Sequence, residues 1–371
     1  MKFLILLTLL FLITIAFAQN QVTIYQQNLA VVSITKKVQL KKGINFVPLS
    51  EIPQNVSPDS FFIVTNNGSI ITEVLYPPTG VWIESPSDME ETLDIFYILQ
   101  NINWSAYHLL LIDNDQLKFK TNVLIKNNTP SYLQNVKVNL LAGEVSLTED
   151  RFFDLKSVDM EADMSMQKEK SFESLQGYKI YSIPDEISIS PNGTKIIPLI
   201  DTNIKNALKR YIYEYSKSFD SVFIFWEFDN KKENGLGIPI PEGNINIFVK
   251  DQGRTVFLGE SPLDNTPEEK KISILQGIDF DLKGERIVVS STEKKNGNYT
   301  VKESSVKIKL LNAKKENVVI DVIEYLGKGW QITSSNIPAE RLDENRALFK
   351  VEVKAQSTFT LEYTYKVTYL K

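Results

Sequence analysis

Turn residues and alternating apolar residues follow one another without a break over the stretch 233–286. Glycine and proline punctuate its entry, Ile245, Ile247 and Val249 then alternate with polar residues, and a turn sequence follows at 251–253. Alternation with a period of two is typical of strands that bury one face, and tight turns between such runs favour β-hairpins. This stretch therefore predicts consecutive β-hairpins.

Similar alternation marks most of the remaining chain. It predicts three strands over 22–49, two strands joined by a loop over 70–97, and hairpins over 103–145 and 306–325. The tract 208–228 could pass for a helix, but its tyrosines alternate and favour a strand. The sequence therefore predicts strands in nearly every region.

The fold class predicted is mainly β, with two to three β-sandwich-like domains, the last of them immunoglobulin-like. About seven short strands fit the chain after Ile278, which is the number and spacing expected of that sandwich. The charged, methionine-containing tract 146–177 is expected to be a mobile excursion or a short helix at the surface of the central domain. The predicted divisions are a signal peptide at 1–18, an N-terminal β region at 19–97, a central β domain at 98–277 and the C-terminal sandwich at 278–371.

Length and composition limit the classes of function. A chain of 371 residues can bury two or three cores, and 43% hydrophobic with 23% charged residues is typical of globular proteins. Cysteine is absent, which excludes disulfides, thiolate metal sites and a cysteine nucleophile. The formal charge is −5, and it becomes −6 without residues 1–18 because Lys2 is their only charged side chain. No basic stripe offsets that charge, so nucleic acid is not an expected partner.

The N-terminus carries the pattern of an export signal. Lys2 is followed by an uncharged, mostly apolar run that closes with Ala16-Phe17-Ala18, the small-x-small pattern before a cleavage site. We expect cleavage after Ala18 and an extracellular or cell-envelope location, with no transmembrane span in the mature chain. The alternative is an uncleaved membrane anchor, although the run is shorter than the ~20 residues that span a bilayer.

Several spaced motifs resemble the family named domain of unknown function 4139, which also forms the C-terminal part of mucoidy-inhibitor-A-like proteins. They are VTIYQQNLAVVSITKKVQLKKGINFVPLSEIPQNVSPDSFFI, the segment from NINWSAYHLLL to NLLAGEV, LGIPIPEGNINIFVKDQGRTVFLGE, and GIDFDLKGER. The resemblance covers nearly the whole mature chain. It implies no activity, since the family is named for lacking one. The long coiled-coil segment that many relatives carry is missing here.

Candidate catalytic residues are few. His108 is the only histidine, so a Ser-His-Asp triad could form only around it. It lies in a strand-like run and the chain has no serine-elbow motif, which favours a structural role. Asp279 and Asp281 are expected on one strand face, and a glycosidase would need two such carboxylates set apart in a cleft. The sequence predicts no catalytic and no cofactor-binding residues.

Metal sites are also not predicted. The runs 113–115 and 279–281 offer oxygen ligands for calcium, but they lack the spacing of a calcium-binding loop, so turn chemistry explains them better. Met160, Met164 and Met166 could suit Cu(I), or they could be incidental residues of a flexible loop, which is the preferred interpretation.

Six Asn-x-Ser/Thr sequons are candidate modification sites. In an exported chain they would be glycan acceptors if the organism has the machinery, and chance occurrence is the alternative. They begin at Asn55, Asn67, Asn103, Asn127, Asn192 and Asn298.

The C-terminal region carries two further expectations. Trp330 should belong to the core of the last sandwich. Residues 357–370 alternate over an unusually long run, which either completes the core or extends as an edge for self-association by strand pairing.

Two functions follow from this sequence. The first is a non-enzymatic binding, adhesion or structural role on the cell surface, with a surface protein or glycan as partner. The alternative is a secreted, carboxylate-dependent glycan hydrolase. The absence of a catalytic motif favours the first.

Overall fold

The computed structural model describes residues 19–54, 56–114, 116–143, 145, 172–175 and 177–370. Strands hold 70% of these residues and helices 2%, so the prediction of a mainly β, sandwich-like fold with several sheets is confirmed. The helices of the described ranges are short 3-10 turns, η1 (Pro58–Ser60) and η2 (Lys232–Asn234). No helix within those ranges is long and apolar enough to cross a membrane.

The chain divides into two compact units, each built from two stretches of sequence. Unit 1 comprises Met1–Ser105 and Val123–Ile197, and unit 2 comprises Ala106–Asn122 and Pro198–Lys371. This division differs from the consecutive one expected from the sequence. Strand β19 (Lys271–Asn296) runs through residue 277 without a break.

An eight-stranded sheet forms most of unit 1, in the order β11-β12-β10-β1-β2-β7-β4, with β13 paired to β10. Buried and partly exposed residues alternate along its longest strands, as the apolar period of two predicts. The strands are β1 (Gln19–Tyr25), β2 (Leu29–Leu40), β4 (Phe61–Thr65), β7 (Met89–Gln100), β10 (Leu133–Ala142), β11 (Phe172–Leu175), β12 (Tyr178–Ser182) and β13 (Ile187–Ile189).

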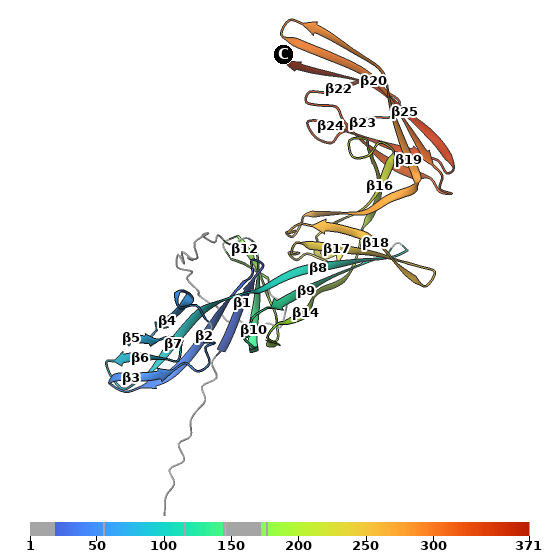
Figure 1. Ribbon diagram of the computed structural model, residues 1–371. Coiled ribbons are helices and arrows are strands. Elements are labelled where there is room, and N and C mark those ends of the chain that lie inside the picture. The colour runs from blue at the N-terminus through green and yellow to red at the C-terminus, as the bar shows by residue number, and fades with distance from the viewer. Residues whose placement is uncertain are drawn as a thin grey trace, which may run out of the picture. The chain divides into compact units, whose positions relative to one another are not determined.

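A separate three-stranded sheet, which we call the small sheet, completes unit 1 (Figure 1). It has β6 (Gly80–Ser85) between β3 (Gly43–Pro48) and β5 (Ile70–Leu75). One side of it is buried through Val81 and Ile83, both fully inaccessible. The other side is partly exposed, through Ile44, Phe46 and Ile70 among others.

Unit 2 contains most of a five-stranded sheet in the order β14-β9-β8-β17-β18 and all of a nine-stranded sheet in the order β22-β25-β20-β19-β16-β15-β21-β24-β23. The first sheet consists of β8 (Ile102–Asp113), β9 (Gln116–Asn127), β14 (Gly193–Ile204), β17 (Gly243–Asp251) and β18 (Arg254–Leu263). The second adds to β19 the strands β15 (Leu208–Glu214), β16 (Ser221–Asp229), β20 (Tyr299–Asn312), β21 (Val318–Tyr325), β22 (Gln331–Ser335), β23 (Ala339–Arg341), β24 (Arg346–Val353) and β25 (Ser357–Leu370).

The nine-stranded sheet folds over a single core. Phe349 of β24 and Tyr363 of β25 lie near opposite ends of the hydrogen-bonded order, yet their ring centroids are 4.9 Å apart. Trp330 is 5% exposed and belongs to the same buried cluster, so its predicted core position is confirmed. The tract 208–228 forms β15 and β16 of this sheet, which confirms the choice of strand over helix.

Of the expected consecutive hairpins in 233–286, β17 and β18 form one. Gln252 and Gly253 both have positive φ at its turn, as a type I′ hairpin requires. The next strand, β19, leaves for the nine-stranded sheet, so β18 and β19 are not a hairpin. The connection between them is held by Asn230, whose side-chain nitrogen donates to the carbonyls of Ile238 and Pro267.

The hairpins expected at 103–145 and 306–325 are wrong for a shared reason. β9 and β10 belong to different sheets, and β20 and β21 pair with other strands. A fully buried asparagine turns the chain in each case: Asn127 donates to the carbonyl of Ser131, and Asn312 donates to that of Glu316. Each amide oxygen also accepts from the backbone two residues on. Buried amides that replace the ladder hydrogen bonds produce arches in place of hairpins.

Some sequence predictions lie outside the described residues. These are the signal peptide at 1–18, the methionine cluster and most of the excursion at 146–177, of which residues 172–175 form β11. The residues 55 and 115 lie outside them as well.

Candidate functional site

The exposed side of the small sheet, which we call the outer face, is an apolar surface built from three cross-strand rows. The registers place these rows across β3, β6 and β5. Directly opposed residues have Cβ atoms about 5 Å apart, so each row is a line of neighbouring side chains. The rows are Ile44, Glu84 and Ile70; Phe46, Trp82 and Glu73; and Pro48, Gly80 and Leu75.

Large apolar side chains remain exposed on this face. Ile44 is 72% exposed, Ile70 64% and Phe46 44%. Phe46 and Trp82 form a tilted pair, with ring centroids 5.0 Å apart and an angle of 51° between the ring planes. Scattered exposed apolar residues are normal, but a contiguous group with two aromatic rings is typical of a binding surface.

Gly80 provides the seat for the Phe46 ring. A Cβ atom added at Gly80 would lie 2.2 Å from the ring, so any larger residue would have to displace it. Gly80 has no positive φ, so the close approach of the ring explains the glycine, and backbone conformation does not. The position of Phe46 against Trp82 therefore depends on this glycine.

The charged residues in the rows are both acidic. Glu73 and Glu84 lie beside the apolar side chains, and none of the nine row positions, all within the described residues, is basic. The outer face therefore combines an aromatic pair with hydrogen-bond acceptors.

A buried carboxylate supports the turn that leads into β5. Glu91 of β7 is fully buried and accepts hydrogen bonds from the backbone N–H groups of Asn66, Asn67 and Ser69. Burial raises the pKa of Glu91, but hydrogen bonds from Ser69, Asn67 and Thr92 outweigh it and leave the pKa below its usual value. The charged carboxylate thereby fixes the start of one strand of the small sheet.

His108 lies in β8 and is inaccessible to solvent. Its Nδ1 is 2.8 Å from the Thr121 hydroxyl, and its ring stacks on Phe119 with centroids 5.5 Å apart. Burial lowers the pKa of His108 to about 4, so the imidazole is neutral at physiological pH. These contacts fit a core histidine.

The expectation that Asp279 and Asp281 share a face is wrong. A bulge in β19 places Lys283 opposite Ser221 and Asp279 opposite Val222, so the three residues between them have no partner in β16. Asp279 is consequently buried, with an oxygen 2.7 Å from the Lys314 ammonium, while Asp281 is exposed. A bulge reverses the alternation on which the expectation rested. The described residues hold no group of three or more metal-ligating side chains.

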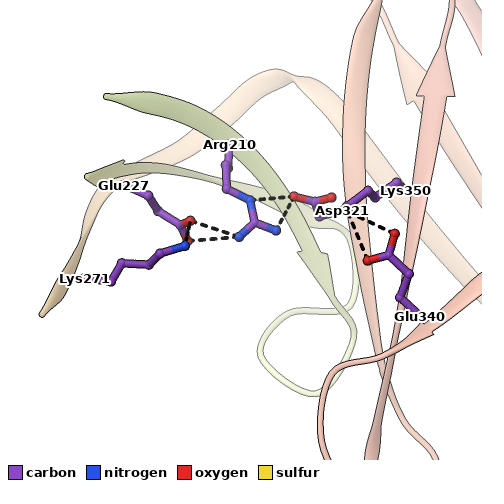
Figure 2. A network of polar contacts seen from close by, with 6 residues as sticks. All are labelled: Arg210, Glu227, Lys271, Asp321, Glu340 and Lys350. Atoms are coloured by element: carbon purple, nitrogen blue, oxygen red, sulfur yellow. Dashed lines mark hydrogen bonds and ion pairs between the residues drawn. The ribbon is translucent and has the colours of Figure 1, made fainter. Parts of the chain in front are cut away.

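The six carboxylates that are buried in the described part of the chain all have partners. Arg210 is the clearest case: its guanidinium lies between Glu227 and Asp321, with nitrogen–oxygen distances of 3.0 and 2.5 Å (Figure 2). Lys271 is 3.5 Å from Glu227, and a Lys350–Glu340 pair continues along the same sheet. The other four carboxylates are paired with Lys217 (Glu214), Lys314 (Asp279), Arg286 (Glu324) and backbone N–H groups (Glu91).

The sequons differ in accessibility. Asn127 does not fit the expected glycan acceptor, because its amide nitrogen is buried and donates to the carbonyls of Ser131 and Ser190. Asn67, Asn192 and Asn298 are exposed. Asn103 is partly buried in β8, and Asn55 lies outside the described residues.

The C-terminal strand completes the core. β25 pairs with β20 along its whole length, and Leu361 and Tyr363 are buried. β22 covers its other edge at 363–366, so among the described strands only β20 pairs with 367–370. Assembly through this end remains a prediction.

The outer face was not found from the sequence. The sequence did contain a sign of it. Ile44 and Phe46 lie on one side of β3 and Val47 lies on the other, and a strand that is apolar on both sides needs a packing partner on each side. No family model matches the chain, and no curated protein matches it. The resemblance to domain of unknown function 4139 therefore stays a prediction.

Proposed function

We propose that the protein is a non-enzymatic binding protein of the cell envelope or extracellular space, which contacts a cell-surface glycan or protein through the outer face. The observation that carries this proposal is the Phe46–Trp82 pair, in which Phe46 is 44% exposed and lies over Gly80 and Trp82 is partly buried. Aromatic rings that lie together with neighbouring apolar side chains are a common feature of ligand-binding surfaces.

Two further points support a binding role. The buried carboxylates are engaged by arginine, lysine or backbone N–H groups, and a glycosidase acid instead needs a carboxyl kept ready to donate a proton in a cleft. The leader-like residues 1–18 and the lack of cysteine agree with export without disulfides. Asn67, Asn103, Asn192 and Asn298 are the glycan acceptors that we propose.

Export and binding can be tested on one purified product. N-terminal sequencing of the secreted protein should begin near Gln19, and a membrane-bound product with an intact Met1 would contradict the proposed cleavage. The secreted protein should sediment with cell envelopes from the producing organism, and Phe46→Ala combined with Trp82→Ala should abolish this. Phe280→Ala is the matched control, because Phe280 is 91% exposed in unit 2.

A further inference from the structure

The size of the outer face limits what it can bind. Three strands about 4.8 Å apart, each with six residues rising about 3.3 Å per residue, give a face of about 10 by 18 Å. Its area is on the order of 200 Å², whereas each partner in a stable protein complex buries about 800 Å². The small sheet by itself therefore fits a chain-like ligand better than a folded protein.

The aromatic pair indicates the chemistry of that ligand. The faces of aromatic rings are electron-rich and attract weakly positive C–H groups. A sugar ring presents such C–H groups on its flat side and hydroxyls around its edge. Phe46 and Trp82 lie at 51° to one another, so neighbouring sugar units of a twisted chain can each lie against one ring.

The charges on the face select among glycans. The carboxyl oxygens of Glu73 and Glu84 can accept hydrogen bonds from hydroxyls. They repel phosphate, sulfate and carboxylate groups, and no basic side chain in the three rows offsets them. An anionic glycan is therefore disfavoured.

We infer that the outer face binds a neutral glycan chain, with sugar rings on Phe46 and Trp82 and hydroxyls hydrogen-bonded to Glu73 and Glu84. This inference rests on the proposed function and specifies its ligand. The strongest rival of the same size is an extended apolar peptide, for which Ile44 and Ile70 would be suitable contacts.

The test compares envelopes treated in two ways. Periodate cleaves the vicinal diols of sugars, and protease removes surface proteins. Binding of the secreted protein should fall at least 10-fold after periodate and stay unchanged after protease. Heparin, an anionic polysaccharide, should not compete. Binding that survives periodate and is lost after protease would overturn the glycan inference and leave the proposed function standing, as would competition by heparin that depends on Phe46.

Single variants distinguish failure of the glycan inference from failure of the proposed function. Phe46→Ala and Trp82→Ala should each reduce envelope binding at least 10-fold, while Phe280→Ala should not change it. Near-ultraviolet circular dichroism establishes that the variants are folded. If the wild-type protein does not bind envelopes, or if the two variants bind as well as wild type, both the inference and the proposed function are wrong.

Tryptophan emission gives an independent readout. Trp104, Trp226 and Trp330 are at most 5% exposed, so Trp82 is the tryptophan that a ligand on the outer face can reach. Soluble polysaccharide released from the envelopes should shift the emission of the wild-type protein and leave Trp82→Phe unchanged. An equal shift in both proteins would contradict binding at this face.

Discussion

Two sheet faces that point away from their cores carry opposite chemistry. The nine-stranded sheet places charges of alternating sign across neighbouring strands, with Arg210 between Glu227 and Asp321 (Figure 2). The small sheet places Phe46 and Trp82 at equivalent outward positions. The nine-stranded sheet also exposes apolar side chains, such as Phe280, which is 91% exposed. In the outer face, apolar side chains lie in adjacent rows where the region around Arg210 has a row of ion pairs, and this contrast is what the proposed function explains.

A substitution in the buried core of the nine-stranded sheet should lower the stability of the protein the most. Its effect is a reference for substitutions on the two sheet faces. Trp330 is 5% exposed, and the Arg341 guanidinium lies 4.0 Å from its ring centre. Trp330→Ala should lower the free energy of unfolding by about 3 to 5 kcal/mol, since it leaves a cavity. Urea denaturation of the whole protein measures this change. A loss no larger than that of the surface variant Lys350→Ala would contradict a core role for the Trp330 side chain.

The row of charged residues on the nine-stranded sheet should lose much stability when Arg210 is substituted and little when Lys350 is substituted. Arg210→Ala leaves Glu227 and Asp321, which are 10% and 8% exposed, without their shared cation. Removing one partner from a largely buried ion pair costs about 3 kcal/mol. Lys350→Ala is the matched control, because its pair with Glu340 is exposed and contributes at most about 0.5 kcal/mol. Equal losses in urea denaturation would show that burial does not distinguish the two positions.

Glu91 should make the small sheet sensitive to acid. Its pKa is lowered in the folded protein, so its contribution to stability is complete above the usual glutamate value of 4.5 and is lost as the pH falls through the lower folded value. Glu91→Gln should cost about 2 kcal/mol at pH 7, because one amide cannot accept as the carboxylate does. Amide hydrogen exchange at residues 66–69 measures this loss of stability. The difference in protection between Glu91→Gln and the wild-type protein should become smaller below pH 4.5. A difference that is constant with pH would contradict this role.

Strand content was predictable because apolar alternation depends only on local sequence and on which side of a strand is buried. The β17–β18 hairpin was predictable for the same reason, since its turn residues determine its geometry. The two arches were not predictable from the sequence. Asn127 and Asn312 resemble ordinary turn residues, and only the structure shows their amides buried against backbone carbonyls. Pairing partners of a strand are likewise decided by tertiary contacts.

The candidate site depended on information of the same non-local kind. Gly80 reads as part of a turn after two prolines, and only the register of β6 with β3 brings it under the ring of Phe46. The bulge near Asp279 is also invisible in the sequence, and it reversed the expected face of one aspartate.

Substitution of Gly80, which lies under the Phe46 ring, should have a smaller effect on the free energy of unfolding, and this effect can be measured separately. Gly80→Ala places a methyl group in the volume of the ring, and overpacking of this kind costs about 1 kcal/mol when the ring can move. Gly80→Ala should reduce envelope binding by more than this loss of stability suggests, because it moves the Phe46 ring away from Trp82. In a Phe46→Ala background the same substitution should cost much less stability, because only the Val47 carbonyl oxygen, 3.1 Å from the added Cβ atom, remains close; thermal unfolding of the four proteins measures the coupling. An unchanged cost in that background would mean that Gly80 is required for some other contact.

The smallest expected change in stability belongs to the residue with the largest expected role in binding. Phe46 is 44% exposed and its ring covers Gly80, so Phe46→Ala removes few buried contacts and should alter the free energy of unfolding by at most about 0.5 kcal/mol. Phe280→Ala should be equally mild, since Phe280 is 91% exposed. Only the first should reduce binding to envelopes. If Phe46→Ala destabilises the protein as strongly as Arg210→Ala does, the ring serves the fold, and the contrast between the two sheet faces has no functional meaning.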